Sequence, residues 1–531
     1  MGWTGAHTLW IDRVVTTALP ARMNQPKRVE TIVVGAGAAG SVIAARITED
    51  GARQVLLLEA GPDYPDPSEL PRDLGDGRTN SMRRHDWRLT HRPTSQAMMR
   101  FPYPRGRVVG GSSAVNTCIA LRGMPEDYDA WAARGLKEWS WAHCLPAFKS
   151  LETDHDIQNE WHGDRGPLPI RRHPTDELTP WQCAFLEACE RVGYPAAPDS
   201  NDPTQAGYGP HAMNRIDGRR ISAAEAWLTP KVRAREGLEI QPDTLVRRVL
   251  FEGRRAVGVE VMRGRQVEVY EAERIVLCAG AIHTPGILLR SGVGPKDQVE
   301  ALGVSLVADN PAIGARLLDH PGFAFFLLPR WGKSHRQAPL IQTVCRYTSD
   351  GSPQPNDMLL QPGNLVPFPR FKLPLVSLMG SVGKPRGVGA LRWTSPNPKK
   401  RPTIALDLLA HDADRARAVD AMSRAFALVE TPPMRALVRH LWPRRKILSD
   451  PARIDEWIRR SCDSGYHPSG TVPMGADDDP DAATDVRGAV RGVEGLIVAD
   501  ASLMPTIPSS NTHLPTLMIG ERFGTWLRAA P

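Results

Sequence analysis

The stretch Thr31-Ile-Val-Val34, followed at once by Gly35-Ala-Gly37-Ala-Ala-Gly40, decides the fold expected for this chain. Its β-branched start predicts a buried parallel strand, and the composition of Ser41–Arg46 then favours a helix. A second apolar run, Gln54–Leu58, ends at Glu59. Strand, glycine turn, helix, strand and acid in this order predict a βαβ unit that binds a dinucleotide.

Each glycine of this turn has a mechanical role. Gly35 permits the tight turn, Gly37 lets a pyrophosphate approach the backbone, and Gly40 lets the helix pack on the strand. The pyrophosphate is then held by unpaired N–H groups at the helix N-terminus. Glu59 is placed to accept hydrogen bonds from a ribose hydroxyl, and its charge disfavours a 2′-phosphate, so NADP is not expected. The fingerprint alone does not choose between NAD and FAD.

Further strands of the same kind are spread along the chain. Gly237–Gly258 alternates as strand, turn and strand, Arg274–Cys278 is a buried strand ending at a glycine turn, and Gly495–Asp500 is another. Met124–Leu151 has helical spacing. From about residue 311 to 480 the composition changes, with many prolines and no nucleotide-type glycine turn. We therefore expect a nucleotide-binding domain assembled from separated pieces, and a second domain for the substrate.

Composition excludes several functional classes. The 531 residues, 41% hydrophobic and 24% charged, fit a globular enzyme with a large core. No apolar run is long enough to cross a bilayer, so no integral membrane segment is expected. Met1–Glu30 makes a poor signal peptide, and the seven cysteines contain no C-x-x-C pair. Reduced thiols in a cytoplasmic protein, with no metal site, are the prediction.

The net charge of +7 includes the clusters Lys399–Arg401 and Arg444–Lys446. No basic stripe interleaves with aromatic residues, so solvated loops are favoured over nucleic-acid binding. Weak attraction to anionic surfaces is left open.

Longer motifs resemble the glucose–methanol–choline (GMC) family of flavoenzymes. Pro104–Asn116, which contains Gly-Gly-Ser-Ser, resembles its first signature, and Gly280–Pro295 its second. Shorter matches follow in family order: Gly207-Tyr-Gly-Pro210, Arg220-Ile-Ser-Ala223, Gly314–His320, Tyr466–Thr471 with Met474-Gly475, Val498–Ser502 and Asn511–Thr516. The resemblance covers about residues 30 to 528 and is specific because the motifs are long and ordered.

The resemblance implies FAD, with its adenine end in the βαβ unit. The expected fold is α/β (α+β overall), with a Rossmann-like FAD-binding domain and a discontinuous antiparallel-sheet substrate domain. The expected division is a flexible extension over 1–29, an FAD-binding domain mainly over 30–310 with inserted segments at about 63–105 and 155–210, a substrate domain mainly over 311–490, and a return to the FAD-binding domain over 491–531. A monomer or homodimer is expected.

The fingerprint and the resemblance together predict a set of cofactor-binding residues. They are Gly35, Gly37, Ala38, Ala39, Gly40, Glu59, Ala60, Arg107, Val109, Gly110, Gly111, Ser112, Ser113, Asn116, Val246, Ala279, Gly280, Asp500, Ala501 and Thr512. Small residues permit close approach, and polar groups meet phosphate or ring edges. Some relatives attach FAD through a histidine two residues after the second signature serine. Val115 takes that place here, so non-covalent FAD is predicted.

His467 lies in the tight turn Gly465-Tyr-His-Pro-Ser-Gly470, and the resemblance matches it to the residue that accepts the alcohol proton as hydride leaves for flavin N5. A hydroxyl group is too weak an acid to ionise alone, so a neutral imidazole must serve as base. Asn511 matches the second catalytic position and can donate to the developing oxyanion. His513 stands where many bacterial relatives have Asn, and is left as a competitor for that second role.

The substrate expected is a small non-sugar primary alcohol, aliphatic or aromatic, and the acceptor is oxygen or an electron carrier. Apolar residues suggest the pocket: Phe325, Phe326, Leu359, Leu360, Val366 and Phe368. A choline cage could not be assigned among Trp87, Phe368, Phe371 and Trp393. Two alternatives of the same fold are an FAD-dependent lyase and a light-driven fatty-acid decarboxylase; the His-Pro-Ser-Gly-Thr turn argues against the decarboxylase.

Overall fold

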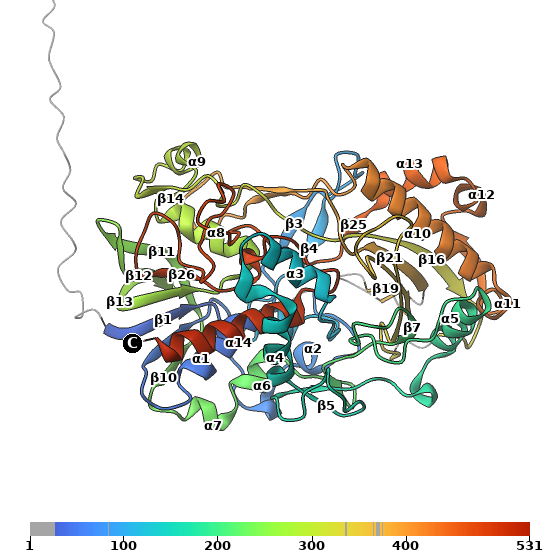
Figure 1. The fold of residues 1–531 in the computed structure, drawn as a ribbon, viewed down its shortest axis with the longest axis horizontal. Helices are drawn as coiled ribbons and strands as arrows, with labels where there is room; N and C mark the ends of the chain where they lie inside the picture. The colour runs from blue at the N-terminus through green and yellow to red at the C-terminus, as the bar shows by residue number, and fades with distance from the viewer. Residues whose placement is uncertain are drawn as a thin grey trace, which may run out of the picture.

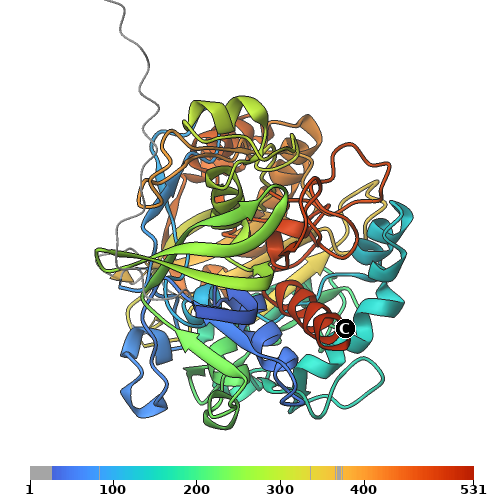
Figure 2. The ribbon, with the colours of Figure 1, turned by 90° about the vertical axis from the view of Figure 1, so that its left-hand side faces the viewer.

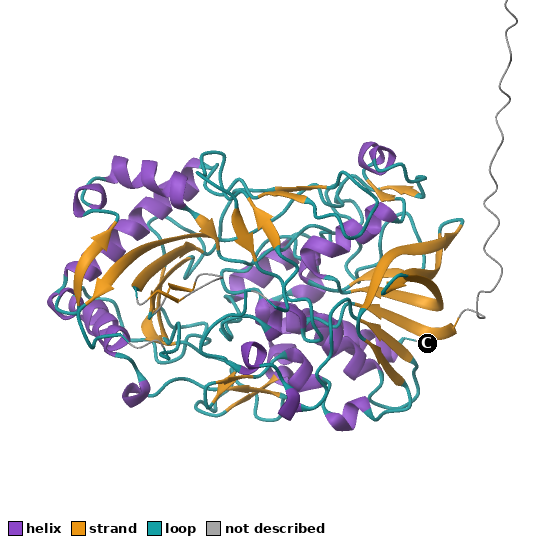
Figure 3. Cartoon of the chain, turned by 180° about the vertical axis from the view of Figure 1, so that it is seen from behind, coloured by secondary structure: helices purple, strands orange, loops and turns teal. Residues whose placement is uncertain are grey.

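The computed structural model describes residues 27–82, 84–334, 337–364, 366–367, 372–373 and 375–530. Most of the predicted N-terminal extension lies outside these residues, as do Phe368 of the predicted pocket and Phe371, which was weighed for a choline cage. Two groups of strands occupy opposite ends of the molecule, with helices between and around them (Figure 3). Within the described part of the chain, no helix is both long and apolar enough to cross a membrane.

The first sheet is the predicted dinucleotide-binding sheet. It has the order β10-β2-β1-β13-β12-β11, and β26 also pairs with β13. Its strands are β1 (Lys27–Val34), β2 (Val55–Leu58), β10 (Leu238–Gln241), β11 (Thr244–Glu252), β12 (Arg255–Arg263), β13 (Gln266–Leu277) and β26 (Leu496–Val498). β10, β2, β1, β13 and β26 run parallel, while β12 and β11 are antiparallel. Each strand predicted in this region is confirmed.

The first and last helices of the chain pack together on this sheet. α1 (Ala38–Ile47) follows β1, and α14 (His513–Ala529) closes the chain beside it. The two helices approach closely because α14 carries glycine one turn apart; a Cβ on Gly520 would lie 2.9 Å from the backbone of Ala39. Figure 2 shows the C-terminal helix against the N-terminal strands. Two helices that are far apart in the sequence, α1 and α14, therefore form one layer on the sheet that carries the glycine turn.

The second sheet is wholly antiparallel, with the order β24-β16-β21-β18-β17-β7 and β25 paired to β16. Its strands are β7 (Gly207–Pro210), β16 (Pro321–Pro329), β17 (Thr343–Tyr347), β18 (Met358–Gly363), β21 (Val376–Val382), β24 (Val438–Trp442) and β25 (Asp463–Ser464). One face packs on α10 (Asp412–Glu430), shown beside it in Figure 1. The prediction of a separate antiparallel sheet is confirmed.

The remaining helices lie around these two sheets. They are α2 (Arg72–Gly75), α3 (Pro125–Ala133), α4 (Trp141–Leu151), α5 (Pro180–Arg191), α6 (Ala223–Trp227), α7 (Pro230–Arg233), α8 (Gly280–Arg290), α9 (Lys296–Ala301), α11 (Pro432–Arg435), α12 (Arg445–Leu448) and α13 (Pro451–Ser461). Pairs of short strands also form, among them β3 (Leu89–His91) with β4 (Phe101–Tyr103). The helical spacing of Met124–Leu151 is confirmed by α3 and α4.

The side chains of β16 and β18 alternate between the hydrophobic core on one face of the second sheet and the cavity on the other face. Phe325 and Leu360 are fully buried in the core that includes α10, whereas Phe326 and Leu359 line a cavity on the opposite face. Successive side chains of a strand point to opposite faces, so only one of each pair can reach the cavity. The prediction that Phe325 and Leu360 line the pocket is therefore wrong. Each instead contributes roughly 1.5–3 kcal/mol of burial to the core.

Candidate functional site

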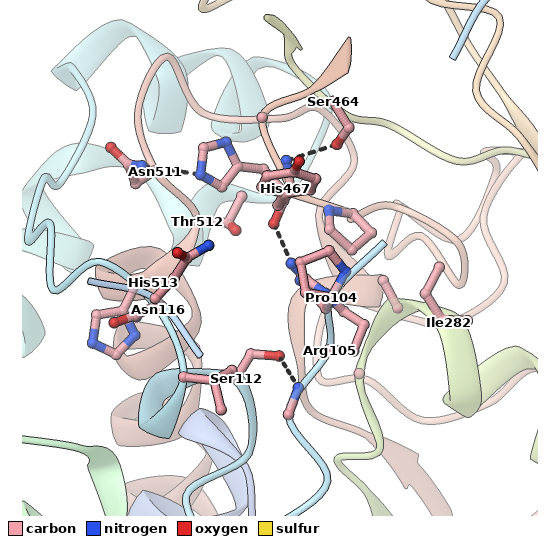
Figure 4. Close-up of a pocket in the computed structure, with 18 of the residues that line it drawn as sticks. Pro104, Arg105, Ser112, Asn116, Ile282, Ser464, His467, Asn511, Thr512 and His513 are labelled. Carbon is pink, nitrogen blue, oxygen red and sulfur yellow. Dashed lines mark hydrogen bonds between the residues drawn. The ribbon is translucent and has the colours of Figure 1, made fainter. Parts of the chain in front are cut away.

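A cavity of about 980 Å³ extends from the dinucleotide turn to the second sheet. It is lined by both predicted catalytic residues, His467 and Asn511, and by most of the predicted cofactor residues. Those lining it are Gly35, Gly37, Ala38, Ala39, Glu59, Ala60, Gly111, Ser112, Ser113, Asn116, Val246, Ala279, Gly280, Asp500, Ala501 and Thr512. Segments distant in the sequence thus meet around one space, part of which Figure 4 shows.

Four of the predicted cofactor residues are not part of this lining. Gly40 packs against the turn, where a Cβ would lie 1.9 Å from the carbonyl oxygen of Gly35. Arg107 donates to the carbonyl oxygen of Ala60 over 3.1 Å. The N–H groups of Val109 and Gly110 donate to the carbonyl oxygens of Pro62 and Ala36. These residues shape the wall and do not face the cavity.

The turn at Gly37 leaves open space beside the start of α1. A Cβ on Gly37 would meet no protein atom closer than 4.0 Å, so it would project into the cavity. Ala38 and Ala39 begin α1, and their N–H groups have no acceptor one turn earlier. An anion at this point would gain hydrogen bonds and the favourable helix dipole.

Glu59 ends β2 with its side chain buried against the same turn. Its two oxygens accept hydrogen bonds from the N–H groups of Ala36, over 3.1 Å, and Gly61, over 2.9 Å. Burial raises the pKa of the Glu59 carboxyl to about 7, against the lowering effect of these N–H groups. The carboxyl lines the cavity where the sequence places a ribose-binding acid.

The Gly-Gly-Ser-Ser loop reaches the cavity mainly through its backbone. The Ser113 hydroxyl donates to the carbonyl oxygen of Gly110 over 2.5 Å, and accepts from the N–H of Ala223. Ser112 Oγ accepts from the N–H of Gly106 over 3.2 Å. Asn116 is held by its own Oδ1, which accepts from the N–H of Cys118. The serines thus stiffen the loop from within.

Asp500 also acts within the protein. Its Oδ2 accepts from the N–H of Gly280 over 2.8 Å and from the Thr284 hydroxyl over 2.7 Å, while Oδ1 accepts from Ser502. Burial raises the pKa of this carboxyl despite these donors. Asp500 therefore ties the start of α8 to the end of β26, and so sets this wall of the cavity.

The turn carrying His467 is held by Asp319. Oδ1 of Asp319 accepts from the N–H groups of His467, over 2.9 Å, and His320, over 2.8 Å, and Oδ2 accepts from Ser464 and Tyr103. Gly465 leaves room for the two imidazoles, because a Cβ there would lie 3.0 Å from His467 Nδ1. The space that this glycine provides is therefore occupied by the histidine pair.

The hydrogen bonds of His320 fix the tautomer of His467. His320 Nε2 lies 3.0 Å from two carbonyl oxygens, those of Gly383 and Pro508, so it must carry a hydrogen. In a neutral ring Nδ1 of His320 then accepts, and its partner 2.9 Å away is His467 Nδ1. His467 Nδ1 therefore donates, which leaves Nε2 as a free base. This protonation state is inferred from the hydrogen-bond network.

Electrostatics keep the His467 ring uncharged. Burial, followed by the neighbouring His320 ring and the Arg105 guanidinium, holds the pKa of His467 well below its usual range. Burial also lowers the pKa of His320. At neutral pH both rings are thus unprotonated at one nitrogen, and His467 Nε2 is able to accept a proton.

Asn511 is the residue that meets this free nitrogen. Its Nδ2 donates to His467 Nε2 over 3.0 Å, as Figure 4 shows. His513 lies apart from His467, beside Asn116, and burial lowers the pKa of His513 to about 4. His513 Nε2 is buried without a hydrogen-bond partner in the described part of the chain and lines the cavity. The geometry pairs Asn511, rather than His513, with His467.

The cavity face of the second sheet is largely apolar. Ala324 and Phe326 of β16, Leu359 of β18 and Met379 of β21 line it. Of the tryptophans weighed for a choline cage, Trp87 lines this cavity, with its ring centre 4.0 Å from that of His283, while Trp393 packs against the glycines at 286 and 314. These apolar side chains are suited to a hydrocarbon substrate.

A second buried histidine forms the group most like a metal site among the described residues. Nδ1 of His162 lies 2.8 Å from Glu152 Oε1 and 3.0 Å from Asp154 Oδ2, and its Nε2 lies 2.7 Å from Asp199 Oδ2. Burial opposes charge on this ring, but hydrogen bonds to the three carboxylates outweigh it and raise the pKa of His162 to about 10. Arg172 pairs with Asp154 and Asp199. Protonated imidazole and guanidinium already supply the positive charge here.

The sequence reasoning did not assign His320 and Asp319 to the site. Both lie in the stretch Gly314–His320, which was noted only as a connecting motif. An Asp-His pair directly before a strand was the available signal, since two polar residues there must find partners when buried. Arg105, which donates to the carbonyl oxygen of Tyr466 over 2.6 Å, was also missed.

Comparisons with known proteins agree with this fold. Sequence profiles described as GMC oxidoreductase match residues 29–322 and 385–520. The chain is 35% identical to the mitochondrial choline dehydrogenase of Homo sapiens, over 94% of this chain and 90% of that protein. It is 34% identical to the 5-(hydroxymethyl)furfural oxidase of Methylovorus sp. strain MP688, over 92% and 97%. The crystal structure of pyridoxine 4-oxidase from Mesorbium loti superposes with a TM-score of 0.86 at 32% identity, covering 94% and 99%.

The fold and the cavity together define a flavin-dependent oxidoreductase. The chain belongs to the GMC oxidoreductase family, whose members bind FAD and oxidise alcohols. The residues present fit that cofactor, because Gly37 leaves open space at the start of α1 and the unpartnered His513 Nε2 offers a polar contact within the cavity.

Proposed function

We propose that this enzyme oxidises a non-sugar primary alcohol to an aldehyde, with His467 as the base and FAD as the hydride acceptor. The observation that supports this most directly is the unprotonated Nε2 of His467, kept uncharged by burial and oriented by His320. An alcohol oxygen that replaced the hydrogen bond between Nε2 and Asn511 Nδ2 would meet Nε2 as an acceptor and Nδ2 as a donor. Those are the two partners that a hydroxyl group losing its proton requires.

The steps performed by the protein follow from this arrangement. His467 Nε2 takes the hydroxyl proton, and the amide of Asn511 donates to the oxygen as negative charge develops. The carbinol carbon then loses its hydrogen with both bonding electrons, which leaves the aldehyde. FAD, when bound, supplies the acceptor for that hydride at N5. The protonated His467 returns its proton to solvent or to the acceptor that reoxidises the cofactor.

We infer that FAD is held here without a covalent bond. Val115 lines the cavity at the position where some relatives carry a linking histidine, and its side chain has no nucleophilic atom. Acid precipitation should therefore release yellow FAD into the supernatant. Colour retained in the washed protein pellet would show that a covalent link forms through another residue.

The substrate we propose is uncharged. The side chains of β16, β18 and β21 that line the cavity among the described residues carry no charge and include Ala324, Phe326, Leu359 and Met379. An apolar wall favours an aliphatic or aromatic tail. The electron acceptor we propose is either oxygen or an electron carrier. The comparisons give no support to the lyase alternative.

An anaerobic screen that follows flavin absorbance tests this function. Benzyl alcohol, 5-(hydroxymethyl)furfural, choline and 3,3-dimethylbutan-1-ol are the probes; the last has the shape of choline without its charge. We expect bleaching by the neutral alcohols, and faster bleaching by 3,3-dimethylbutan-1-ol than by choline. No bleaching by any primary alcohol would refute the oxidation itself, whereas a preference for choline would refute only the uncharged substrate.

A further inference from the structure

The far edge of the second sheet carries exposed apolar side chains that the core does not use. Trp331 is 94% exposed, Trp442 is 49% exposed and Leu328 is 46% exposed. They are carried by the neighbouring strands β16 and β24: Trp442 pairs with Phe326 at one end, and Trp331 follows the other end, where Pro329 pairs with Val438 and the N–H of Arg330 donates to Leu437. An exposed cluster of this kind marks an interaction surface.

Unpaired positive charge surrounds these side chains. Arg330, Lys333, Arg439, Arg444 and Lys446 are exposed and form no ion pair within the described ranges. Residues 328–337 and 433–449 contain no aspartate or glutamate. We call the eight residues Leu328, Arg330, Trp331, Lys333, Arg439, Trp442, Arg444 and Lys446 the basic tryptophan face. In Figure 1, β16 and α12 lie at the same end of the molecule, opposite β12 and β13.

The same surface borders the substrate cavity. Trp442 lines the cavity and stacks near Phe326, with ring centres 5.9 Å apart, and near Trp457, with ring centres 5.7 Å apart. All three rings belong to the cavity lining, and the Trp442 side chain is 49% exposed. Trp442 is therefore the residue that the cavity wall and the basic tryptophan face share.

We propose that the basic tryptophan face docks on an anionic lipid bilayer, with the cavity entrance turned toward the lipid. Tryptophan favours the membrane–water interface, and basic residues beside apolar ones are typical of proteins that lie on a membrane. Near an anionic surface each lysine or arginine contributes about 1 kcal/mol, or roughly a fivefold gain in binding. An apolar alcohol dissolved in the bilayer would then enter the cavity directly.

Charge excludes the simplest competing partner. Two copies joined symmetrically through this face would bring like charges together, which disfavours association. A nucleic acid would use the cations, but it would leave Leu328 and the aliphatic part of the face without an apolar partner. A bilayer satisfies both parts of the surface.

Co-sedimentation of the FAD-loaded protein with vesicles tests the proposal. We expect binding to vesicles of phosphatidylcholine mixed with phosphatidylglycerol, little binding to phosphatidylcholine alone, and weaker binding at high salt. Arg444→Glu with Lys446→Glu should weaken partitioning at least tenfold, and Trp331→Ser should weaken it severalfold. None of these residues lines the cavity, so flavin reduction by a soluble alcohol should be unchanged.

Matched variants at the opposite end of the molecule provide the control. Arg254→Glu with Arg265→Glu makes the same charge change on the hairpin turns of the first sheet, and Val267→Ser removes a side chain that is 53% exposed. These variants should bind as the wild type does. Equal losses in both sets, no preference for anionic vesicles, binding of duplex DNA but not vesicles, or a dimer that Trp331→Ser dissociates would each overturn the proposal.

Discussion

Two buried histidines in this enzyme are held in opposite charge states. His467 faces another imidazole and an amide, and its pKa lies well below the usual value. His162 lies among three carboxylates, which raise its pKa to about 10. Burial disfavours the charge on both rings, so the difference arises from the neighbours. The His467 ring is neutral and able to accept a proton, whereas the His162 ring is a cation that pairs with carboxylates inside the fold.

The largest effect on the rate of flavin reduction should come from removing the His467 ring, whereas removing the His162 ring should change that rate little. His467→Ala is expected to slow flavin reduction by about 10²–10⁴-fold, since the base is removed, while FAD stays bound. His162→Gln should leave the rate of reduction within a few-fold of wild type, because that ring touches no cavity residue of the active site. Anaerobic stopped-flow at saturating alcohol measures both. Full-speed reduction by His467→Ala would remove His467 from the mechanism.

Breaking the charged cluster should affect stability instead. Arg172→Met leaves Asp154 and Asp199 short of positive charge, and we expect the free energy of unfolding to fall by about 3–5 kcal/mol. The matched control is Arg191→Met, which removes an exposed pair with Glu187 and should cost less than about 1 kcal/mol. Urea unfolding followed by tryptophan fluorescence gives both values. Equal values for the two variants would show that the cluster is not a structural element.

A smaller effect is expected from the residue that orients the base. His320→Gln removes the ring that sets the His467 tautomer, and we expect a loss of roughly ten- to hundredfold in flavin reduction. His320 also lowers the pKa of His467, so the acid limb of the rate profile should move to higher pH in this variant. A purely structural role would lower the rate without moving that limb, and would count against the assignment.

Changes in pH should affect a different property for each ring. For His467 this property is the rate of flavin reduction, and for His162 it is the stability of the protein. The neutral form of His467 persists below pH 6.5, so flavin reduction in the wild type should stay level through that pH and fall only at lower values. The raised pKa of His162 gives stability that is complete below pH 6.5 and is lost as the pH rises to about 10. The difference in melting temperature between wild type and His162→Gln should therefore shrink over that range. A constant difference would mean that His162 does not titrate there.

Local patterns predicted the first sheet because each strand carries its own signal. The runs before Gly35, Glu59 and Gly280 are short, apolar and followed by turn residues, so they could be assigned without tertiary information. The two faces of the second sheet could not be separated in the same way. Phe325 and Phe326 are both apolar, and only the pairing of β16 with its neighbours decides which one reaches the cavity.

Only part of the site could be predicted from the sequence, because some of its contacts are made to the folded backbone. His467 and Asn511 stand in motifs that the family resemblance recognises, and the structure brings them into contact. The ring that makes Nε2 the free nitrogen is His320, 147 residues earlier in the chain. Its role depends on two carbonyl oxygens, at Gly383 and Pro508, and a carbonyl oxygen has no sequence signature.

The parallel sheet receives the strand β26 from residues 496–498, and α14 covers α1 only after residues 513–529 have been made. A ribosome that has translated the glycine turn must therefore add more than four hundred residues before that turn gains its covering helix. Until then the nascent chain exposes the apolar edge of β13, which is prone to wrong pairing. Completion of the cavity therefore waits for the last elements described, because Asp500, Asn511 and Thr512 belong to its lining.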